Sequence, residues 1–359
     1  MAHIGWAFGP EFFSIPGGPL EFKPRPAGII LYDEVTGTAL LLTIISMTLD
    51  LWAPRGILGI APFYETWFLK LNDPANRNAL WVRYSLVQRL GGAEATGWFV
   101  LFDAQREEVF QRRYNFKETE LALSAADPLY RAGANILERR RARGGWEGVE
   151  WDVRCEREVV PGGELIPPIL GRLGIASSMY AAVIGGGTFQ GEASCDGRRY
   201  VFTQAAGSAG HLWGRRMGRQ WRWAHATFQD PSGDWVGFEI LSAQGRLGPA
   251  STPVVTSARL WKGGRLHVSL GLWAGLRNKT FSRPGGWSFR VHFDGFIAEG
   301  DCASREESTA RLEYEGPRGE SLVCRSSMLG ACRLSLTDRS GAGIAEYRTQ
   351  DSAAVEEAR

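Results

Sequence analysis

The chain has 359 residues, which is enough for two domains and a large buried core. Its 41 basic and 39 acidic residues leave a formal net charge of +2, which excludes the strong positive field of a nucleic-acid-binding protein. Its five cysteines have no CxxC spacing, so we expect free thiols in a reducing cytoplasm rather than a disulfide framework or a zinc site.

The first 50 residues show little periodicity, because prolines such as Pro10, Pro16 and Pro24 interrupt any regular element. We therefore expect a poorly ordered leader over residues 1–50. The apolar run Ala39–Met47 is too short to span a bilayer, and it lacks the basic flank and cleavage site of a signal peptide. The predicted location is the cytoplasm, and peripheral contact with a membrane for ligand uptake is left open.

From residue 62 onward the chain has the alternation of β-strands. Phe63–Leu71, Ala79–Leu90 and Gly97–Asp103 are predicted strands separated by short turns, which favours a sandwich or barrel over βαβ units. Arg106–Phe116 continues this pattern weakly, and Asp127–Arg143 is predicted to be a short helix.

Further strands follow on both sides of a predicted domain boundary. We place one domain at residues 51–205, a second at 206–350, and a loose tail at 351–359. Leu165–Tyr180 is interpreted as a loop because it contains two prolines and small residues. The other predicted strands are Trp146–Glu156, Tyr200–Gln204, Ala258–Lys262, Arg265–Trp273, Trp287–Ala298, Thr309–Gly316, Glu320–Met328, Ala331–Asp338 and Ala342–Tyr347.

A β-hairpin near residue 230 has a predictable register. Gln220–Gln229 and Trp235–Ser242 alternate as strands, and the turn residues Asp-Pro-Ser-Gly-Asp separate them. If the loop has five residues, His225 lies opposite Glu239. Period-two alternation then places both side chains on one face of the sheet, together with Trp221, Trp223 and Leu241.

An imidazole opposite a carboxyl group on an aromatic wall suits proton transfer in an apolar cavity. The alternative is an ordinary cross-strand ion pair between His225 and Glu239, worth roughly 0.2–1 kcal/mol.

Two more groups of residues are candidates for the same site. His211 and Trp213 form an HxW pair, in which the imidazole can exchange a proton and the indole can stabilise a carbocation. Trp67 and Trp81 lie on earlier strands that face the same cavity in this interpretation. Alternatively, Trp213 is a core residue and His211 bonds to a backbone carbonyl. HxxxH, HExxH, GxSxG and Walker motifs are absent, so metal, α/β-hydrolase and nucleotide chemistry have no support in the sequence.

These motifs resemble a known family. Gly210–Gly214 (GHLWG), Trp221–His225 (WRWAH) and Trp67–Tyr84 are similar to the lipocalin-like hydroxyneurosporene synthase superfamily, which includes carotenoid 1,2-hydratases, AttH-like proteins and tocopherol cyclase relatives. The resemblance implies an all-β fold of two lipocalin-like (calycin) β-barrel domains packed side by side, with few short helices. It also implies an apolar cavity near their junction.

The resemblance also implies roles for single residues. In the hydratases an HxW pair and a Tyr-x-Asp pair act on an isoprenoid double bond, and His211 and Trp213 match the first pair. The strand that follows reads Gly-Phe-Glu-Ile, so the Tyr-x-Asp pair is absent, and Glu239 is the predicted replacement acid, kept protonated by an apolar wall.

The leading hypothesis is a hydratase or cyclase that protonates an alkene of an isoprenoid or polyene-like substrate without a metal or organic cofactor. Its partner is a small apolar ligand, and no oligomeric state is predicted. The predicted catalytic residues are Glu239, His211 and His225, and the predicted substrate-binding residues are Trp213, Trp221, Trp223, Trp81 and Trp67. A non-catalytic carrier of an apolar ligand explains the same tryptophans, and so does a pericyclase-like protein that folds a polyene without moving a proton.

Overall fold

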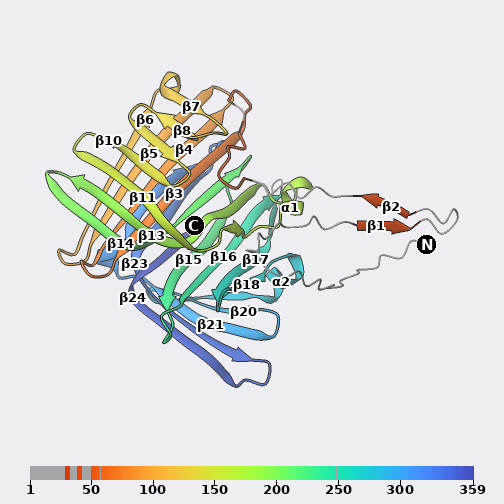
Figure 1. Cartoon of the computed structure of the whole chain (residues 1–359). Coiled ribbons are helices and arrows are strands. Elements are labelled where there is room, and N and C mark those ends of the chain that lie inside the picture. The colour runs from red at the N-terminus through yellow and green to blue at the C-terminus, as the bar shows by residue number, and fades with distance from the viewer. Residues whose placement is uncertain (1–28, 33–38, 43–49, 57, 248–249) are drawn as a thin grey trace, which may run out of the picture. The chain divides into compact units, whose positions relative to one another are not determined.

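The computed structural model describes residues 29–32, 39–42, 50–56, 58–247 and 250–359 (Figure 1). Residues 1–50 form one unit and residues 51–359 form a second. In the first unit, β1 (Ile29–Tyr32) pairs antiparallel with β2 (Ala39–Leu42). The other residues of the predicted leader, apart from residue 50, lie outside the described ones, so its disorder stays a prediction.

The larger unit contains two antiparallel sheets. The first has twelve strands, and β12 (Gly163–Glu164) pairs with β13 at its side. In hydrogen-bonded order the other strands are β6 (Glu108–Phe116), β5 (Gly92–Asp103), β4 (Asn78–Arg89), β3 (Phe63–Asp73), β14 (Arg198–Gly214), β13 (Ser178–Cys195), β11 (Val149–Val160), β10 (Arg141–Trp146), β9 (Asn135–Glu138), β8 (Tyr130–Ala132) and β7 (Leu121–Leu123).

The first sheet curves into a nearly closed barrel around its own core. Side chains of β3 to β5, such as Trp67, Val82 and Phe99, share one buried cluster with those of β11 and β13, such as Val153 and Phe189. Because these strands lie in different parts of one continuous sheet, the sheet must fold over to bring their apolar faces together.

The second sheet has ten strands, and β22 (Ala310–Glu315) pairs with β23 at its side. In hydrogen-bonded order the others are β18 (Arg265–Ser269), β17 (Ala250–Lys262), β16 (Trp235–Leu247), β15 (Gln220–Gln229), β24 (Gly343–Ala358), β23 (Ser321–Asp338), β21 (Phe296–Ala303), β20 (Gly286–His292) and β19 (Lys279–Arg283). Phe238 of β16 and Phe289 of β20 meet in its core, so this sheet is curved as well.

Helices are few and short in the described part of the chain. The α-helices are α1 (Pro168–Arg172) and α2 (Leu272–Arg277), and the 3-10 turns are η1 (Glu118–Glu120) and η2 (Glu306–Ser308). The all-β class and the two lipocalin-like barrels packed side by side are therefore confirmed.

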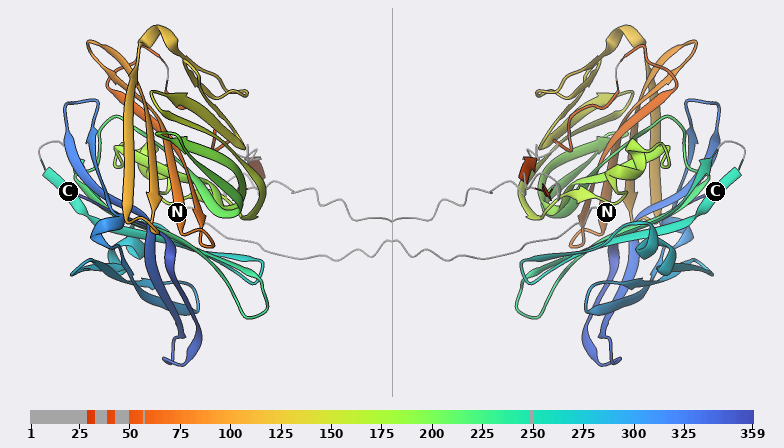
Figure 2. Two further views of the ribbon diagram at one scale, coloured as in Figure 1. Left: turned by 90° about the vertical axis from the view of Figure 1, so that its left-hand side faces the viewer. Right: turned by 90° about the vertical axis from the view of Figure 1, so that its right-hand side faces the viewer.

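The two barrels meet through the outer faces of their sheets. Figure 2 shows the first sheet, coloured orange to green, over the second, coloured cyan to blue. Phe68 and Trp81 from the outer face of β3 and β4 lie in one buried cluster with Trp223, Met328 and Ala354 from the second sheet. Residues that an isolated barrel would expose to water are thus buried at the junction.

Glycines allow the close approach of the sheets. A Cβ added to Gly237 of β16 would lie 2.7 Å from Cγ2 of Val160 at the end of β11, and a Cβ on Gly186 of β13 would lie 3.1 Å from Cγ2 of Thr227 on β15. Both distances are shorter than normal packing contacts, so the junction requires small residues at these positions.

We expect Gly237→Ala to lower the free energy of unfolding by about 1–3 kcal/mol, because the added methyl group overpacks the contact with Val160. Denaturant unfolding measures this change. Gly343→Ala is the matched control, because a Cβ there meets nothing within 4 Å, and its effect should stay within about 0.5 kcal/mol. Equal effects of the two substitutions would contradict this account of the junction.

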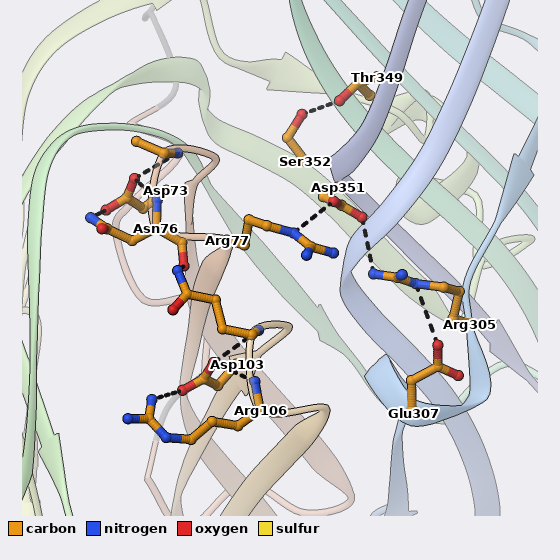
Figure 3. A network of polar contacts seen from close by, with 12 residues as sticks. Asp73, Asn76, Arg77, Asp103, Arg106, Arg305, Glu307, Thr349, Asp351 and Ser352 are labelled. Carbon is orange, nitrogen blue, oxygen red and sulfur yellow. Dashed lines mark hydrogen bonds and ion pairs between the residues drawn. The ribbon is translucent and has the colours of Figure 1, made fainter.

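The end of the chain belongs to the fold and is not a loose tail. β24 continues to Ala358 and pairs with both β15 and β23. Figure 3 shows Asp351 between two arginines: its Oδ2 lies 3.3 Å from Nε of Arg77 in the β3–β4 turn, and its Oδ1 lies 3.2 Å from Nη2 of Arg305. The tail prediction is wrong because polar residues in a central strand look like a solvated terminus in the sequence.

Two other sequence predictions are corrected. The segment Asp127–Arg143 forms β8, β9 and part of β10 instead of a helix, because pairing between neighbouring strands from β7 to β11 outweighs local helix propensity. The predicted boundary at residues 205/206 lies inside β14, which belongs to the first sheet. The second sheet begins at Gln220 of β15.

Candidate functional site

A cavity of about 120 Å³ lies at the junction, between the outer faces of the two sheets. Trp81, Trp221 and Trp223, three of the five predicted ligand-binding tryptophans, line it. The other aromatic side chains in its wall are Tyr64, Phe68, Tyr180 and Tyr314. The cavity therefore offers an aromatic surface to an apolar group.

The predicted register of the β15–β16 hairpin is confirmed. His225 pairs with Glu239 and Trp223 pairs with Leu241 across the two strands. These side chains belong to the outer face of the second sheet, because Ala224 and Phe238 on the opposite face lie in the core of the second barrel. The hairpin thus presents its tryptophans and its carboxyl group to the first barrel.

Glu239 lies directly behind the cavity wall. It is 4% exposed, and its Oε1 accepts hydrogen bonds from the Tyr180 hydroxyl at 2.5 Å and from Nε1 of Trp223 at 3.0 Å. Both donors line the cavity, so Glu239 is connected to the cavity through them. Its Oε2 lies 3.7 Å from Nη1 of Arg259 and has no hydrogen-bond partner among the described residues.

Tyr180 is held neutral by its surroundings. Burial raises the pKa of its hydroxyl well above the ordinary value, and the nearby charge of Glu239 raises it further. The hydroxyl therefore acts as a hydrogen-bond donor to Glu239. Two donors on one oxygen and a guanidinium near the other surround Glu239 with polar groups, whereas the sequence prediction placed it on an apolar wall.

His225 is buried, and neither of its ring nitrogens bonds to Glu239. Its Nε2 lies 2.7 Å from the carbonyl oxygen of Gly185, which can only accept, so Nε2 carries the proton. Its Nδ1 has no hydrogen-bond partner among the described residues. Burial, followed by the charge of Lys70, lowers the pKa of His225 well below its ordinary value, so the ring is neutral. The cross-strand ion pair is thus not formed.

Two buried cations complete the group behind the wall. Lys70 of β3 donates from Nζ to Oδ1 of Asn72 at 2.9 Å, and burial lowers its pKa from 10.5 to about 7, with an opposing effect from Glu239. Arg259 of β17 donates to the carbonyl oxygens of Gly163, at 2.9 Å, and Pro161. We call Lys70, His225, Glu239 and Arg259 the buried charge cluster.

His211 lies on the other face of the first sheet. It stacks on Trp67 with ring centroids 4.6 Å apart, whereas its neighbour Leu212 lines the cavity. Adjacent residues of a strand point to opposite faces, so His211 and Leu212 face opposite sides of the sheet. Tyr180 pairs with Leu212 and bonds to Glu239, so Tyr180 and Glu239 lie on the side away from His211. The expectation that His211 and Glu239 face one ligand is wrong.

The contacts of His211 are those of a structural residue. Its Nδ1 bonds to the carbonyl oxygen of Leu51 at 2.7 Å, as the alternative interpretation held, and its Nε2 lies 2.8 Å from Oε1 of Glu65. Glu65 also accepts from the backbone N–H groups of Arg55 and Gly56. These bonds fasten the segment 51–56 to the barrel.

The two remaining tryptophans of the prediction lie near His211, away from the junction cavity. Nε1 of Trp67 donates to the carbonyl oxygen of Trp52 at 3.0 Å. The half-buried Trp213 contacts the His211 ring at a centroid distance of 4.7 Å and has the Arg55 guanidinium over its own ring. Trp67 and Trp213 therefore do not line the cavity, whereas Leu212 of the GHLWG motif does.

Sequence reasoning missed Lys70, Tyr180, Arg259 and Glu356. The signal for Lys70 was weak: its strand face also carries Tyr64 and Phe68, but a lysine on the outer face of a single barrel is ordinary. Tyr180 had no comparable signal, since it lies in a stretch that we interpreted as a loop.

Some site types are not formed by the described residues. No three or more His, Cys, Asp and Glu side chains among them are grouped so that they would hold a metal ion. Nor does any helix in that part of the chain have the length and apolar composition needed to cross a membrane.

Comparison with curated sequences links the chain to one pair of relatives and to no family model. An uncharacterized protein of Mycobacterium tuberculosis, known as Rv0493c in strain H37Rv and MT0513 in strain CDC 1551, is 25% identical over 93% of this chain and 97% of its own length.

Among the solved structures similar to the chain, three each cover 86% of it. CghA with Sch210972 has a TM-score of 0.51 at 8% identity and 96% coverage of its own chain. Kievitone hydratase from Nectria haematococca and a protein described as AttH from Nitrosomonas europaea both have TM-scores of 0.49 at 11% identity, with 91% and 98% of their chains covered. The likeness to CghA establishes the fold, and the resemblance inferred from the sequence is confirmed at that level.

Proposed function

We propose that the protein is a cofactor-independent hydratase or cyclase that acts on an apolar, unsaturated ligand in the junction cavity. One observation carries this proposal: a buried carboxylate, Glu239, is bonded to two side chains, Tyr180 and Trp223, that both line an aromatic cavity. Burying a charge costs several kcal/mol, and mere storage of a ligand does not require one.

Tyr180 and Glu239 together form a proton-accepting pair. When water or an internal hydroxyl group attacks a carbocation, it must lose a proton. Tyr180 can take that proton on its oxygen while its own hydroxyl proton passes to Oε1 of Glu239, 2.5 Å away. Because the pKa of Tyr180 is raised, the two transfers occur together and no free tyrosinate forms.

The aromatic wall suits the cationic stage of such a reaction. The rings of Trp81, Trp221 and Trp223 border the cavity, and a cation over an indole face gains about 2 kcal/mol or more when it is desolvated. CghA, which shares the fold, was solved with the small molecule Sch210972.

The size of the cavity limits the substrate. An engineered cavity of about 150 Å³ in another protein binds benzene, so about 120 Å³ holds a group near the size of one isoprene unit. A longer isoprenoid or polyene would place one end there, and the rest would extend through the opening. An isoprenoid alcohol is therefore a suitable first probe.

The test is incubation with farnesol or geranylgeraniol in isotopically labelled water, followed by native and chromatographic mass spectrometry. We expect a product that is heavier by one water, or an isomer. Glu239→Gln and Tyr180→Phe should each lower turnover by about 10²–10⁴-fold and leave affinity within a few-fold.

Tyr130→Phe is the matched control, because it removes a hydroxyl bonded to the Ser85 carbonyl inside the first barrel, away from the cavity. It should turn over like the wild type. If the wild type binds the alcohols and returns them unaltered, the protein is a carrier and the proposal is wrong. The mostly apolar lining of the cavity is what favours that second function.

A further inference from the structure

The junction cavity has a second carboxyl group in its wall, and this one borders the cavity directly. Glu356 of β24 is 9% exposed and lines the cavity beside Trp221 and Trp223. Its register partner on β15 is Trp223, so the two side chains project from neighbouring strands toward the same space. Nothing in the sequence marked this residue, since it stands in the predicted tail.

Glu356 has weaker contacts than Glu239. Oε1 accepts a hydrogen bond from the Ser326 hydroxyl at 3.0 Å, Oε2 has a long contact of 3.5 Å from Nε1 of Trp221, and the Cys324 thiol also bonds to the carboxyl group. Burial raises the pKa of Glu356, and the bonds from Ser326 and Trp221 and the charge of Arg83 oppose this only in part. Glu239, by contrast, has strong donors on Oε1 and a cation beside Oε2.

The two carboxyl groups lie on opposite sides of Trp223. Glu239 bonds to Trp223 from β16, on one side of β15, and Glu356 lies opposite Trp223 on β24, on the other side. Glu239 and Glu356 are therefore two strands apart. Strand spacing and rise place their Cα atoms about 12 Å apart. Tyr180 and Glu356 both line the cavity, so a ligand inside it can contact both side chains.

We infer that Glu356 is the catalytic proton donor of the junction cavity, opposite the accepting pair Tyr180–Glu239, for an apolar substrate with an isolated or conjugated alkene. This inference rests on the proposed function, which supplies an acceptor but no donor.

The reaction balances with water as the co-reactant. Glu356 gives its proton to one alkene carbon, whose π electrons form the new C–H bond, and the adjacent carbon becomes cationic. A lone pair of water, or of an internal hydroxyl, forms the C–O bond. The proton released goes to Tyr180, and the proton of Tyr180 goes to Glu239. Exchange with solvent then moves one proton from Glu239 back to Glu356.

A binding titration tests the placement of Glu356 without requiring turnover. Farnesol is uncharged, and a ligand against Glu356 desolvates it further and favours its protonated form. Affinity, measured by quenching of the cavity tryptophans, should therefore be highest near pH 5 and fall about tenfold towards about pH 9. Glu356→Gln should bind tightly at every pH. Glu357→Gln is the matched control, because this neighbouring carboxyl group pairs with Arg222, and it should keep the wild-type profile.

Product formation tests the catalytic role. We expect Glu356→Gln to bind farnesol and lose turnover by at least about 10²-fold, with partial recovery in Glu356→Asp. The same pH profile for the wild type and Glu356→Gln, or equal turnover, overturns the inference. If the wild type shows the predicted binding profile but forms no product, the proposed function fails while the placement of Glu356 against the ligand is upheld. Absence of farnesol binding in the wild type counts against both.

Discussion

Lys70→Met is expected to stabilise the protein, and to do so most at neutral and lower pH. The Lys70 ammonium is 1% exposed and has one hydrogen bond, to Asn72. Its pKa falls from 10.5 to about 7 on folding, and each pH unit corresponds to about 1.4 kcal/mol, so the charged form costs at most about 5 kcal/mol. The stability gained by Lys70→Met is about 1–3 kcal/mol less than this cost, because Oδ1 of Asn72 loses its hydrogen-bond donor.

The sign of the pH dependence follows from proton binding. Between about pH 7 and pH 10.5 the unfolded chain holds a proton on Lys70 that the folded chain lacks, so the wild type gains stability as the pH rises through this window. Below about pH 7 both states are protonated, and the folded state bears the full cost of the buried charge. The advantage of Lys70→Met should therefore shrink as the pH increases from about 6.5 to about 10.

Thermal unfolding across this pH range measures the effect, and several kcal/mol correspond to a shift of roughly 5–10 °C for a chain of this size. Lys279→Met is the control, since that lysine is exposed and its removal should change little at any pH. A Lys70→Met variant that is destabilised equally at every pH would show that the amine carries no buried charge.

The sequence predicted those parts of the fold that depend on local patterns. The β15–β16 register followed from a five-residue turn and period-two alternation, and it correctly paired His225 with Glu239. Strands with clear alternation, such as Phe63–Leu71, were found because one face of each must be apolar. The β8–β10 region was missed because its strands are short and depend on pairing with one another and, through β10, with β11, which no local pattern encodes.

The site was only partly predictable, because it lies between the outer faces of the two sheets. The sequence analysis correctly placed Trp81, Trp221 and Trp223 in one cavity, because they are large aromatic residues in strands with an alternating sequence pattern. Lys70, Arg259 and Glu356 occupy positions that a single barrel would expose, where a charged residue is unremarkable. Only the packing of the second sheet on the first turns these positions into a buried site, and that contact joins segments far apart in the chain.

Arg259→Met is expected to have the second large effect, in the opposite direction. The Arg259 side chain is 4% exposed, lies 3.7 Å from Oε2 of Glu239, and donates to the carbonyl oxygens of Gly163 and Pro161. Its removal leaves a buried carboxylate without its nearest cation and two carbonyl oxygens without that donor. We expect a loss of about 3–5 kcal/mol in the free energy of unfolding, measured by denaturant titration.

The double variant Arg259→Met/Glu239→Gln separates the charge effect from the loss of the carbonyl contacts. It should recover about 1–3 kcal/mol relative to Arg259→Met, because no unpaired carboxylate remains. Arg333→Met is the matched control, as its ion pair with Asp301 is half exposed and worth at most about 1 kcal/mol. No recovery in the double variant would mean that Arg259 acts only through the carbonyl oxygens.

Arg259→Met should also change the titration of Lys70. The buried charge cluster holds two cations near one carboxylate, and without Arg259 the Lys70 ammonium becomes the remaining buried counter-ion of Glu239. The pKa of Lys70 should then rise from about 7 toward its ordinary value, and the gain in stability between about pH 7 and pH 10.5 should flatten. An unchanged pH dependence in Arg259→Met would show that Lys70 and Arg259 do not share Glu239.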